Sequence, residues 1–420
     1  MTNLRYITLN ALYKIIVEKK LSHEIIKETF NTLENTEKAY AQKVIKGVLE
    51  HIEEIDNIIQ KYSKYKINKL KPIVLLILRQ SIFEMFYMDS IPTYATINEA
   101  IKLVKKYKLY GLAPFVNALL RKINDDIIIL KNEDSFKSNQ EKNTKHIYFR
   151  INDIKNSEYI INELLKENID ILYYDGALNF NIYKVLESNN IKKIINSKLF
   201  KDGFITIQDA SSIFMVEKIF KFLCSENLIN KEIKILDICA APGGKSIALK
   251  NILDYKNIKY KFILRDKNIK KIELIRENLF REKIKEDNNF SLEVKNALDT
   301  KSENSKFDLI ICDAPCSGLG VIAKKPDIIM HNKEKIQEIS LLQKQIIDNN
   351  INKINNNGLF IYSTCTITKE ENDDNVEYIL NKFKNIKLLY KKQINVKDEN
   401  KCDGFFISIF KNENKKQEFK

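Results

Sequence analysis

The sequence has little that is typical of a membrane, metal-binding or disulfide-bonded protein. Its longest unbroken apolar run extends only from Ile73 to Leu78, whereas a membrane-spanning helix needs about 20 apolar residues. The first residues lack the apolar core of a signal peptide. The six cysteines form neither metal-ligand pairs nor a disulfide framework. We therefore expect a soluble, cytoplasmic, monomeric protein with reduced cysteines and no bound metal.

Positive charge is in excess. The 420 residues carry a formal net charge of +14, which is spread over residues 1–125 and 201–420, while residues 126–200 are neutral. An excess of this kind favours a polyanionic partner. A compositional bias of the genome is the alternative, because Lys, Asn and Ile are all abundant. The length permits two or three domains.

Residues 1–125 have apolar side chains at helical spacing, for example Leu9, Leu12 and Ile16, and predict a compact helical bundle. Lysines cluster at 61–71 and at 102–108, where they are either phosphate contacts or a solvated face. Three prolines stand at expected helix starts: Pro72, Pro92 and Pro114.

The middle of the chain changes character twice. Residues 126–145 are polar and predict a linker. Residues 146–200 alternate between polar and apolar and predict a small α+β unit, with its first strand at 147–152. Arg150 and Asn152 on that strand are candidate RNA contacts, although a purely architectural role is equally compatible with the neutral charge.

Residues 201–411 alternate between strand and helix around a glycine loop. An apolar run from Lys234 to Cys239 leads into Pro242, Gly243 and Gly244, after which a helical pattern begins. Glycines let the backbone approach a ligand closely, and a helix N-terminus favours a carboxylate or phosphate. Alternating strands and helices predict a parallel sheet covered on both faces, with ligands at the carboxyl ends of its strands. The loop therefore predicts a nucleotide-like ligand, with an ordinary strand-to-helix turn as the alternative.

Carboxylates and thiols follow the ends of the other expected strands. Asp266 is placed to bind ribose hydroxyls, and Asp299 follows the next strand. Asp313 emerges from the apolar strand 307–313 and is followed by Cys316, whereas Cys365 follows the strand 358–363. Either cysteine alone is more typical of a small core residue, but two at strand ends beside a ligand loop indicate thiol chemistry.

These motifs resemble those of the RNA cytosine-C5 methyltransferases, the NOL1/NOP2/Sun family. The resemblance lies in Asp237-x-Cys-Ala-Ala-Pro-Gly-Gly-Lys245, Asp313-Ala-Pro-Cys-Ser-Gly318 and Tyr362-Ser-Thr-Cys-Thr366. Residues 4–123 similarly resemble NusB-like RNA-binding domains, and the small α+β unit resembles the family's ferredoxin-like extension. The resemblance implies a Rossmann-like catalytic domain that uses S-adenosylmethionine.

The same resemblance assigns roles to individual residues. Cys365 is the expected nucleophile, Cys316 assists product release, and Asp313 holds the base. Lys324 and Lys325 are expected to contact RNA phosphates together with Arg150. The expected cofactor-binding residues are Cys239, Ala240, Ala241, Pro242, Gly243, Gly244, Lys245, Asp266, Asp299 and Asp313.

The domain combination implies methylation of a cytosine in 16S ribosomal RNA through a covalent adduct. A transfer RNA, another ribosomal site and a non-catalytic assembly factor are the alternatives. DNA methyltransferases use the cysteine of the Pro-Cys dipeptide, so the presence of both Cys316 and Cys365 favours RNA. The expected domains are 1–125, a linker at 126–145, the α+β unit at 146–200, the catalytic domain at 201–411 and a polar tail at 412–420.

Overall fold

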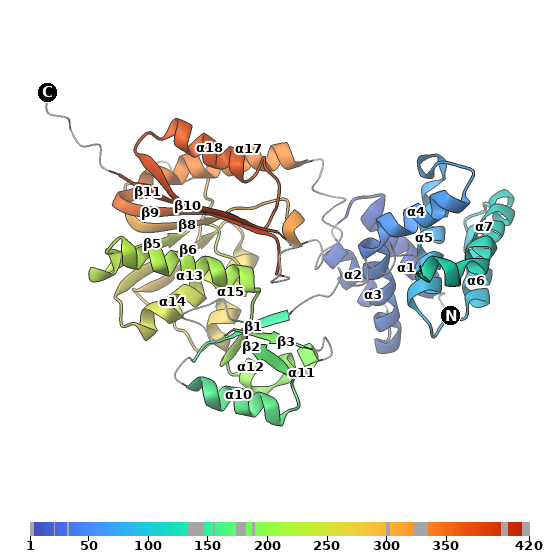
Figure 1. Cartoon of the computed structure of the whole chain (residues 1–420), viewed down its shortest axis with the longest axis horizontal. Coiled ribbons are helices and arrows are strands. Elements are labelled where there is room, and N and C mark those ends of the chain that lie inside the picture. Colours follow the sequence, from blue (N-terminus) through green and yellow to red (C-terminus); the bar gives the residue numbers. More distant parts are fainter. Residues whose placement is uncertain are drawn as a thin grey trace. The chain divides into compact units, whose positions relative to one another are not determined.

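The computed structural model describes residues 4–20, 22–31, 33–132, 147–153, 156–173, 182–186, 190–299, 303–321, 335–395 and 402–413. Contacts divide the chain into two compact units (Figure 1). The first comprises residues 1–144 and 322–331, and the second comprises residues 145–321 and 332–420. In the described parts of the chain, no helix is long and apolar enough to cross a membrane.

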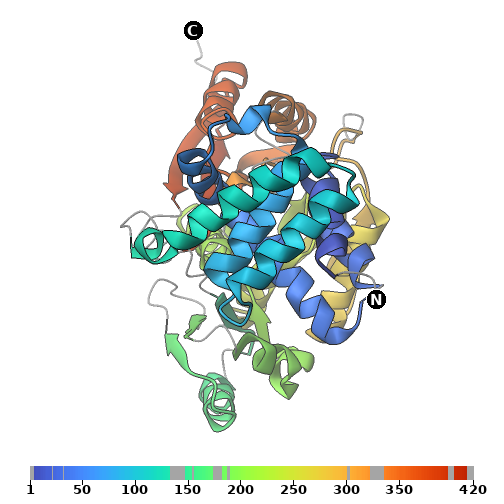
Figure 2. The ribbon, with the colours of Figure 1, turned by 90° about the vertical axis from the view of Figure 1, so that its right-hand side faces the viewer.

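The first unit is a helical bundle, as the periodicity predicts (Figure 2). Pro72 and Pro114 lie in the first turns of their helices, where the missing N–H is not needed. Its α-helices are α1 (Leu4–Ile16), α2 (Ser22–Phe30), α3 (Asn35–Glu50), α4 (Ile52–Tyr62), α5 (Pro72–Tyr87), α6 (Thr93–Lys106), α7 (Ala113–Asp125) and α8 (Ile127–Asn132).

Helix α5 forms the centre of this bundle. It packs against α1, α3, α4, α6 and α7, so it is buried on nearly every side and carries apolar residues all round. Its two buried charges are paired. Arg79 donates from Nε and Nη2 to the carboxylate of Asp56 at 2.8 and 2.7 Å, and Glu84 accepts from Arg5 Nε at 3.0 Å.

The expected linker at 126–145 is in part helical, because α8 continues the bundle to Asn132 and buries Leu130. The residues from 133 to 146 lie outside the described parts of the chain.

The second unit begins with a small antiparallel sheet in the strand order β2-β3-β1-β4. The boundary expected at residue 200 wrongly excludes β4 from this unit. Strand β4 pairs antiparallel with β1, so that Ile205 lies opposite Ile151. Strand β3 begins at Ile182, and residues 174–181 before it lie outside the described residues. The elements are β1 (Ile147–Ile151), α10 (Ser157–Lys166), β2 (Ile171–Tyr173), β3 (Ile182–Val185), α11 (Asn190–Asn196), α12 (Lys198–Lys201) and β4 (Ile205–Ile207).

A seven-stranded sheet forms the rest of this unit, in the order β10-β11-β9-β8-β5-β6-β7. Its strands are β5 (Ile233–Asp237), β6 (Tyr260–Asp266), β7 (Phe290–Val294), β8 (Phe307–Asp313), β9 (Ile354–Thr364), β10 (Ile386–Ile394) and β11 (Phe405–Asn412). The prediction of a parallel sheet is correct from β5 to β9 and wrong at one edge, where β11 runs antiparallel to β9 and β10.

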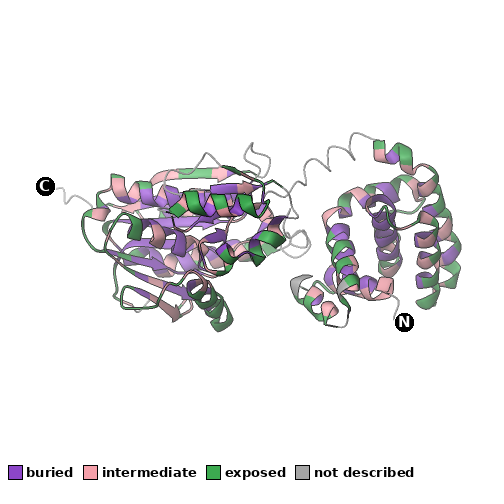
Figure 3. Cartoon of the chain, turned by 90° about the horizontal axis from the view of Figure 1, so that it is seen from below, coloured by how far each residue is buried: buried purple, intermediate pink, exposed green. Residues whose placement is uncertain are grey.

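Helices cover both faces of this sheet, as in a doubly wound fold (Figures 1 and 3). One apolar core contains buried residues of α13, α14 and α15, and a second contains buried residues of α17 and α18. The strands between them are therefore buried on both faces. The covering helices are α13 (Ala210–Ser225), α14 (Gly244–Tyr255), α15 (Ile269–Arg281), α17 (Ile336–Asn350) and α18 (Asp373–Lys382).

Candidate active site

The glycine loop joins β5 to α14. Gly243 has φ of +93°, a conformation that side chains rarely adopt, and it caps the first turn of α14. Asp237, the last residue of β5, accepts from the Cys239 backbone N–H at 3.2 Å and from the Ser246 hydroxyl. Strand, loop and helix start are thus tied together by one buried carboxylate.

Burial also changes the acid–base properties of this loop. Desolvation raises the pKa of Asp237 to about 7, although the hydrogen bond from Ser246 opposes the rise. Desolvation and the nearby carboxylates likewise raise the pKa of Cys239, so its thiol stays protonated. Cys239 is therefore a part of the loop wall and not a nucleophile.

The expected ribose carboxylate lies at the end of β6. Asp266 is 5% exposed, and it accepts from the Asn268 backbone N–H at 3.1 Å. The neighbouring Arg265 is a charged residue at a buried position, which is accommodated because it donates to Glu293 at 2.7 Å and to Glu303 at 2.8 Å. Asp299 is exposed after β7, in a turn where its backbone N–H bonds to the Asn296 carbonyl at 3.0 Å.

A cavity of about 250 Å³ adjoins the glycine loop. It is lined by loop residues 239–242, by Gly244 and Lys245, and by the carboxylates of Asp237 and Asp313. A Cβ added at Gly244 would lie 3.4 Å from Gln208 Nε2, so Gln208 lies against the start of α14 in the wall of this cavity. Open space, acidic side chains and a helix N-terminus together fit the amino-acid end of S-adenosylmethionine. Asp266 and Asp299, the carboxylates expected at the nucleoside, are not among the residues that line this cavity.

The two cysteines meet at the ends of adjacent parallel strands. Cys316 follows β8 and Cys365 follows β9, and their Sγ atoms lie 2.8 Å apart. The Cys365 backbone N–H also donates to Cys316 Sγ at 3.3 Å. Because the strands are neighbours, residues 49 positions apart share one site.

The surroundings make the two thiols unequal. The hydrogen bond from Cys316 lowers the pKa of Cys365, and the ammonium of Lys245 adds to this effect while burial and Asp313 oppose it. The same hydrogen bond together with burial raises the pKa of Cys316 well above its ordinary value. Of the two thiols, Cys365 therefore has the lower pKa, which favours the thiolate at this sulfur.

Asp313 and Lys245 form an ion pair beside the sulfurs. Ser363 Oγ donates to the other carboxylate oxygen of Asp313 at 2.9 Å. Burial lowers the pKa of Lys245, but the negative charge of Asp313 outweighs it and the pKa is raised overall. Lys245 therefore stays charged. Its ion pair with Asp313 places its ammonium beside the two sulfurs and not in solvent.

Sequence reasoning missed Glu371. This carboxylate is fully buried and joins the loops of the two cysteines. Its Oε1 accepts from the Ser317 backbone N–H at 2.8 Å and from Gln343 Nε2 at 3.0 Å, while Oε2 accepts from Thr368 Oγ1 at 2.8 Å. A charged residue six positions after a candidate nucleophile was the only sequence signal.

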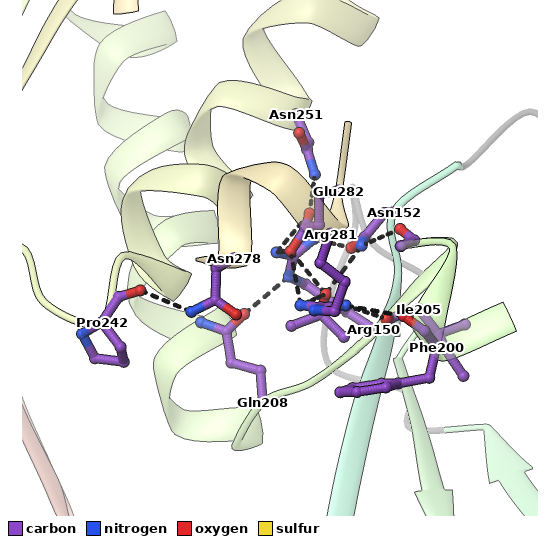
Figure 4. Close-up of polar contacts among 12 residues, drawn as sticks. Arg150, Asn152, Phe200, Ile205, Gln208, Pro242, Asn251, Asn278, Arg281 and Glu282 are labelled. Atoms are coloured by element: carbon purple, nitrogen blue, oxygen red, sulfur yellow. Dashed lines mark hydrogen bonds and ion pairs between the residues drawn. The ribbon is translucent and has the colours of Figure 1, made fainter. Parts of the chain in front are cut away.

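The structure corrects the role expected of Arg150. Its side chain is 0% exposed and donates from Nε to Gln208 Oε1 at 2.8 Å and from Nη2 to Glu282 at 3.3 Å (Figure 4). A side chain enclosed in this way does not reach RNA phosphates. Lys324 and Lys325 lie outside the described residues, so their expected contacts stay predictions.

The described residues contain no group of three or more His, Cys, Asp or Glu side chains that could hold a metal ion. The mixed seven-stranded sheet, the glycine loop after β5 and the carboxylates that end β5, β6 and β8 define an S-adenosylmethionine-dependent methyltransferase.

Two family models match separate parts of the chain. Residues 226–419 match the family model described as 16S rRNA methyltransferase RsmB/F, and residues 2–125 match the NusB family. Residues 226–419 are therefore similar to the RsmB/F methyltransferases, and residues 2–125 are similar to NusB-family domains.

Curated relatives align along most of both chains. The protein named "Probable ribosomal RNA small subunit methyltransferase B" of Bacillus subtilis (strain 168) is 27% identical over 407 residues, covering 89% of this chain and 87% of its own. The "Ribosomal RNA small subunit methyltransferase B" of Proteus mirabilis (strain HI4320) is 26% identical over 442 residues, covering 97% and 98%.

Two solved structures share the fold at 20% sequence identity. PH0851 has a TM-score of 0.66 and covers 97% of this chain and 98% of its own. NSun6 from Pyrococcus horikoshii with SFG has a TM-score of 0.53 and covers 68% of this chain and 96% of its own.

Proposed function

We propose that this protein transfers a methyl group from S-adenosylmethionine to C5 of a cytosine in 16S ribosomal RNA, in the cytoplasm. The observation that carries the proposal is the pair of sulfurs, Cys316 Sγ and Cys365 Sγ, 2.8 Å apart beside the Asp313–Lys245 ion pair. A non-catalytic assembly factor would need neither thiol. The names of the curated relatives support the small-subunit RNA as substrate.

Cytosine requires activation because its C5 is too weak a nucleophile to take a methyl group. In the proposed reaction the Cys365 thiolate adds to C6, so that a C6–S bond forms and the electrons of the C5–C6 double bond make C5 nucleophilic. The bound cofactor supplies an electrophilic methyl group on a sulfonium. After transfer, a base removes the C5 proton, the C6–S bond breaks, and Cys365 leaves as thiolate.

The other residues of the site prepare and release the base. Asp313 accepts a hydrogen bond from the cytosine amino group, and a proton held between its carboxyl group and N3 stabilises the negative charge that develops in the ring. The ammonium of Lys245 keeps Asp313 in place and favours the thiolate of Cys365. Cys316 assists the elimination that frees the product, because its sulfur is within hydrogen-bond distance of Cys365. The target cytosine must be unstacked to expose C6.

Bisulfite sequencing of ribosomal RNA tests the substrate. Cells lacking the gene are compared with cells that carry the restored protein or its Cys365→Ala variant. We expect one 16S cytosine to be protected from conversion only with the restored wild-type protein. No change at any ribosomal cytosine would overturn the assignment, and a changed cytosine in transfer RNA would favour that alternative substrate.

A further inference from the structure

The cavity beside the glycine loop has a wall that does not come from the seven-stranded sheet. Thr206 and Ile207 of β4 and the following Gln208 line it, together with Arg281 at the end of α15. The small antiparallel sheet therefore reaches the cofactor cavity. None of these four residues carries a role in the mechanism described above.

The side chain of Gln208 has a fixed orientation. Its Oε1 accepts from Arg150 Nε at 2.8 Å, and a guanidinium can only donate, so the amide nitrogen must face the other way. That nitrogen lies against the start of α14, since a Cβ added at Gly244 would be 3.4 Å from Gln208 Nε2. Among the described residues, Nε2 has no hydrogen-bond partner.

A buried network holds Arg150 in place (Figure 4). Arg150 and Glu282 are 0% and 2% exposed, and Arg150 Nη2 donates to both oxygens of Glu282 at 3.3 and 3.4 Å. Thr206 Oγ1 donates to Glu282 Oε1 at 2.7 Å, and Arg281 Nη2 donates to the same oxygen at 3.3 Å. Burying an ion pair costs free energy of desolvation, so such a pair adds little to stability by itself. A role of the pair in holding Arg150 in one orientation is therefore the better explanation.

Charged groups of both signs line the cavity. The carboxylates are those of Asp237, Asp313 and Glu282, and the cations are Lys245, which pairs with Asp313, and Arg281, which pairs with Glu282. The amino-acid end of S-adenosylmethionine carries one ammonium and one carboxylate. An ammonium suits the carboxylates, and a carboxylate suits the N–H donors of Gln208 and of the α14 N-terminus, which lie side by side.

We propose that Gln208 binds the carboxylate of the cofactor's amino-acid end through Nε2, and that Arg150, held by Glu282, is the positioning residue that aims it. The inference rests on the cofactor of the proposed function and not on its nucleotide substrate. It gives the small antiparallel sheet a part in cofactor binding.

Calorimetric titration of the full-length protein with two ligands tests the inference. S-adenosylhomocysteine has the amino-acid end, whereas 5′-methylthioadenosine lacks it. We expect Gln208→Met to raise the Kd of S-adenosylhomocysteine about tenfold, which is the loss of one hydrogen bond to a charged group, and to leave the Kd of methylthioadenosine within about twofold. Gln60→Met, at an exposed position of α4 in the other unit of the chain, is the matched control and should change neither Kd.

Two results would overturn the assignment of Gln208. The first is an unchanged Kd for S-adenosylhomocysteine. The second is an equal loss for both ligands, which would make Gln208 a structural residue of the wall. Methylthioadenosine also reports folding, because an unfolded variant would bind neither ligand.

Arg150→Lys tests the positioning role. Lysine keeps the positive charge beside Glu282, but it cannot also donate a hydrogen bond to Gln208. S-adenosylhomocysteine should therefore again bind more weakly, whereas the binding of methylthioadenosine should not change. The double variant Arg150→Lys/Gln208→Met should have a Kd for S-adenosylhomocysteine no higher than that of the weaker-binding single variant, because both substitutions remove the same contact. Additive losses in the double variant would overturn the coupling between Arg150 and Gln208.

This inference and the proposed function can fail separately. Wild-type binding of S-adenosylhomocysteine without any methylated cytosine would refute the proposed function and leave this inference intact.

Discussion

At the scale of residues, the site depends on giving two identical thiols different surroundings. The sulfurs of Cys316 and Cys365 share a hydrogen bond, and the positive charge of Lys245 lowers the pKa of Cys365. We therefore propose that the thiolate forms on Cys365, the sulfur that follows β9. This asymmetry is what a nucleophile and its assisting thiol require.

Alkylation measures this asymmetry directly. Since the pKa of Cys365 is lowered and burial raises that of Cys224, iodoacetamide should modify Cys365 at a lower pH than Cys224, as followed by peptide mass spectrometry. Cys316→Ala removes the donor and should move the Cys365 profile to higher pH. Coinciding profiles for Cys365 and Cys224 would contradict the assignment.

The raised pKa of Asp237 predicts a dependence of stability on pH. The native carboxyl has a pKa of about 7, whereas an unfolded Asp titrates near ~3.9. Between these values the native state binds a proton that the unfolded state does not, so the free energy of unfolding falls as pH rises and levels off above about pH 7. Asp237→Asn should remove this pH-dependent loss of stability, which is on the order of 4 kcal/mol between pH 4 and 8.

Urea unfolding at several pH values measures this effect. Asp89→Asn is the control, since the Asp89 side chain is 94% exposed. Parallel stability curves for the wild type and Asp237→Asn would show that the buried carboxyl is ionised throughout.

Single residues were predictable from the sequence where a motif directly follows a strand. Cys316, Cys365 and Asp313 come within a few residues of β8 and β9, so the order of strands brings them together. Arg150 was not predictable in this way, because its burial depends on Glu282, a partner 132 positions away. Gln208 was not singled out, because its hydrogen-bond partner Arg150 lies 58 positions away.

At the scale of elements, the loops after β8 and β9 are joined by backbone contacts. The Gly320 N–H donates to the Cys365 carbonyl at 3.0 Å, and the Gly404 N–H, just before β11, donates to the Gly320 carbonyl at 2.8 Å. A Cβ at position 320 would lie 2.1 Å from the Gly404 carbonyl oxygen and 2.8 Å from that of Cys365. Only glycine fits between these segments.

Gly320→Ala should therefore displace the Cys365 loop. We expect a loss of about 2 kcal/mol in the free energy of unfolding and at least tenfold slower methyl transfer. Gly111→Ala is the control, because nothing lies within 4 Å of the added Cβ, and it should change stability by less than about 0.5 kcal/mol. Equal stabilities of the two variants, measured by thermal unfolding, would contradict the tight contact.

Elements with a clear period were predictable, and the others were not. The strand expected at 307–313 is β8 with the same bounds. β10 was missed because its sequence, Ile-Lys-Leu-Leu-Tyr-Lys-Lys-Gln-Ile, does not alternate and is mostly half-buried or exposed. The antiparallel edge followed from β11 pairing with β9 and β10, a tertiary arrangement that no local pattern encodes.

At the scale of the whole molecule, the net charge of +14 is the property most relevant to an RNA partner. RNA binding releases counterions, so affinity falls steeply with salt. The proposed function predicts that the Kd for a 16S fragment containing the target rises at least about tenfold between 50 and 200 mM KCl, because several phosphates are contacted. Filter binding measures this, with S-adenosylhomocysteine binding as the less salt-sensitive control. An affinity independent of salt would contradict a phosphate-binding surface.

The covalent adduct between Cys365 and cytosine C6 is the central claim, and trapping it is the most direct test. Cys316→Ala protein is incubated with substrate RNA and S-adenosylmethionine, separated on a denaturing gel and digested for mass spectrometry. The account predicts a stable RNA–protein band with the nucleotide attached to Cys365, which disappears in the Cys316→Ala/Cys365→Ala double variant. Attachment to another residue, or undiminished methyl transfer by Cys365→Ala alone, would contradict it.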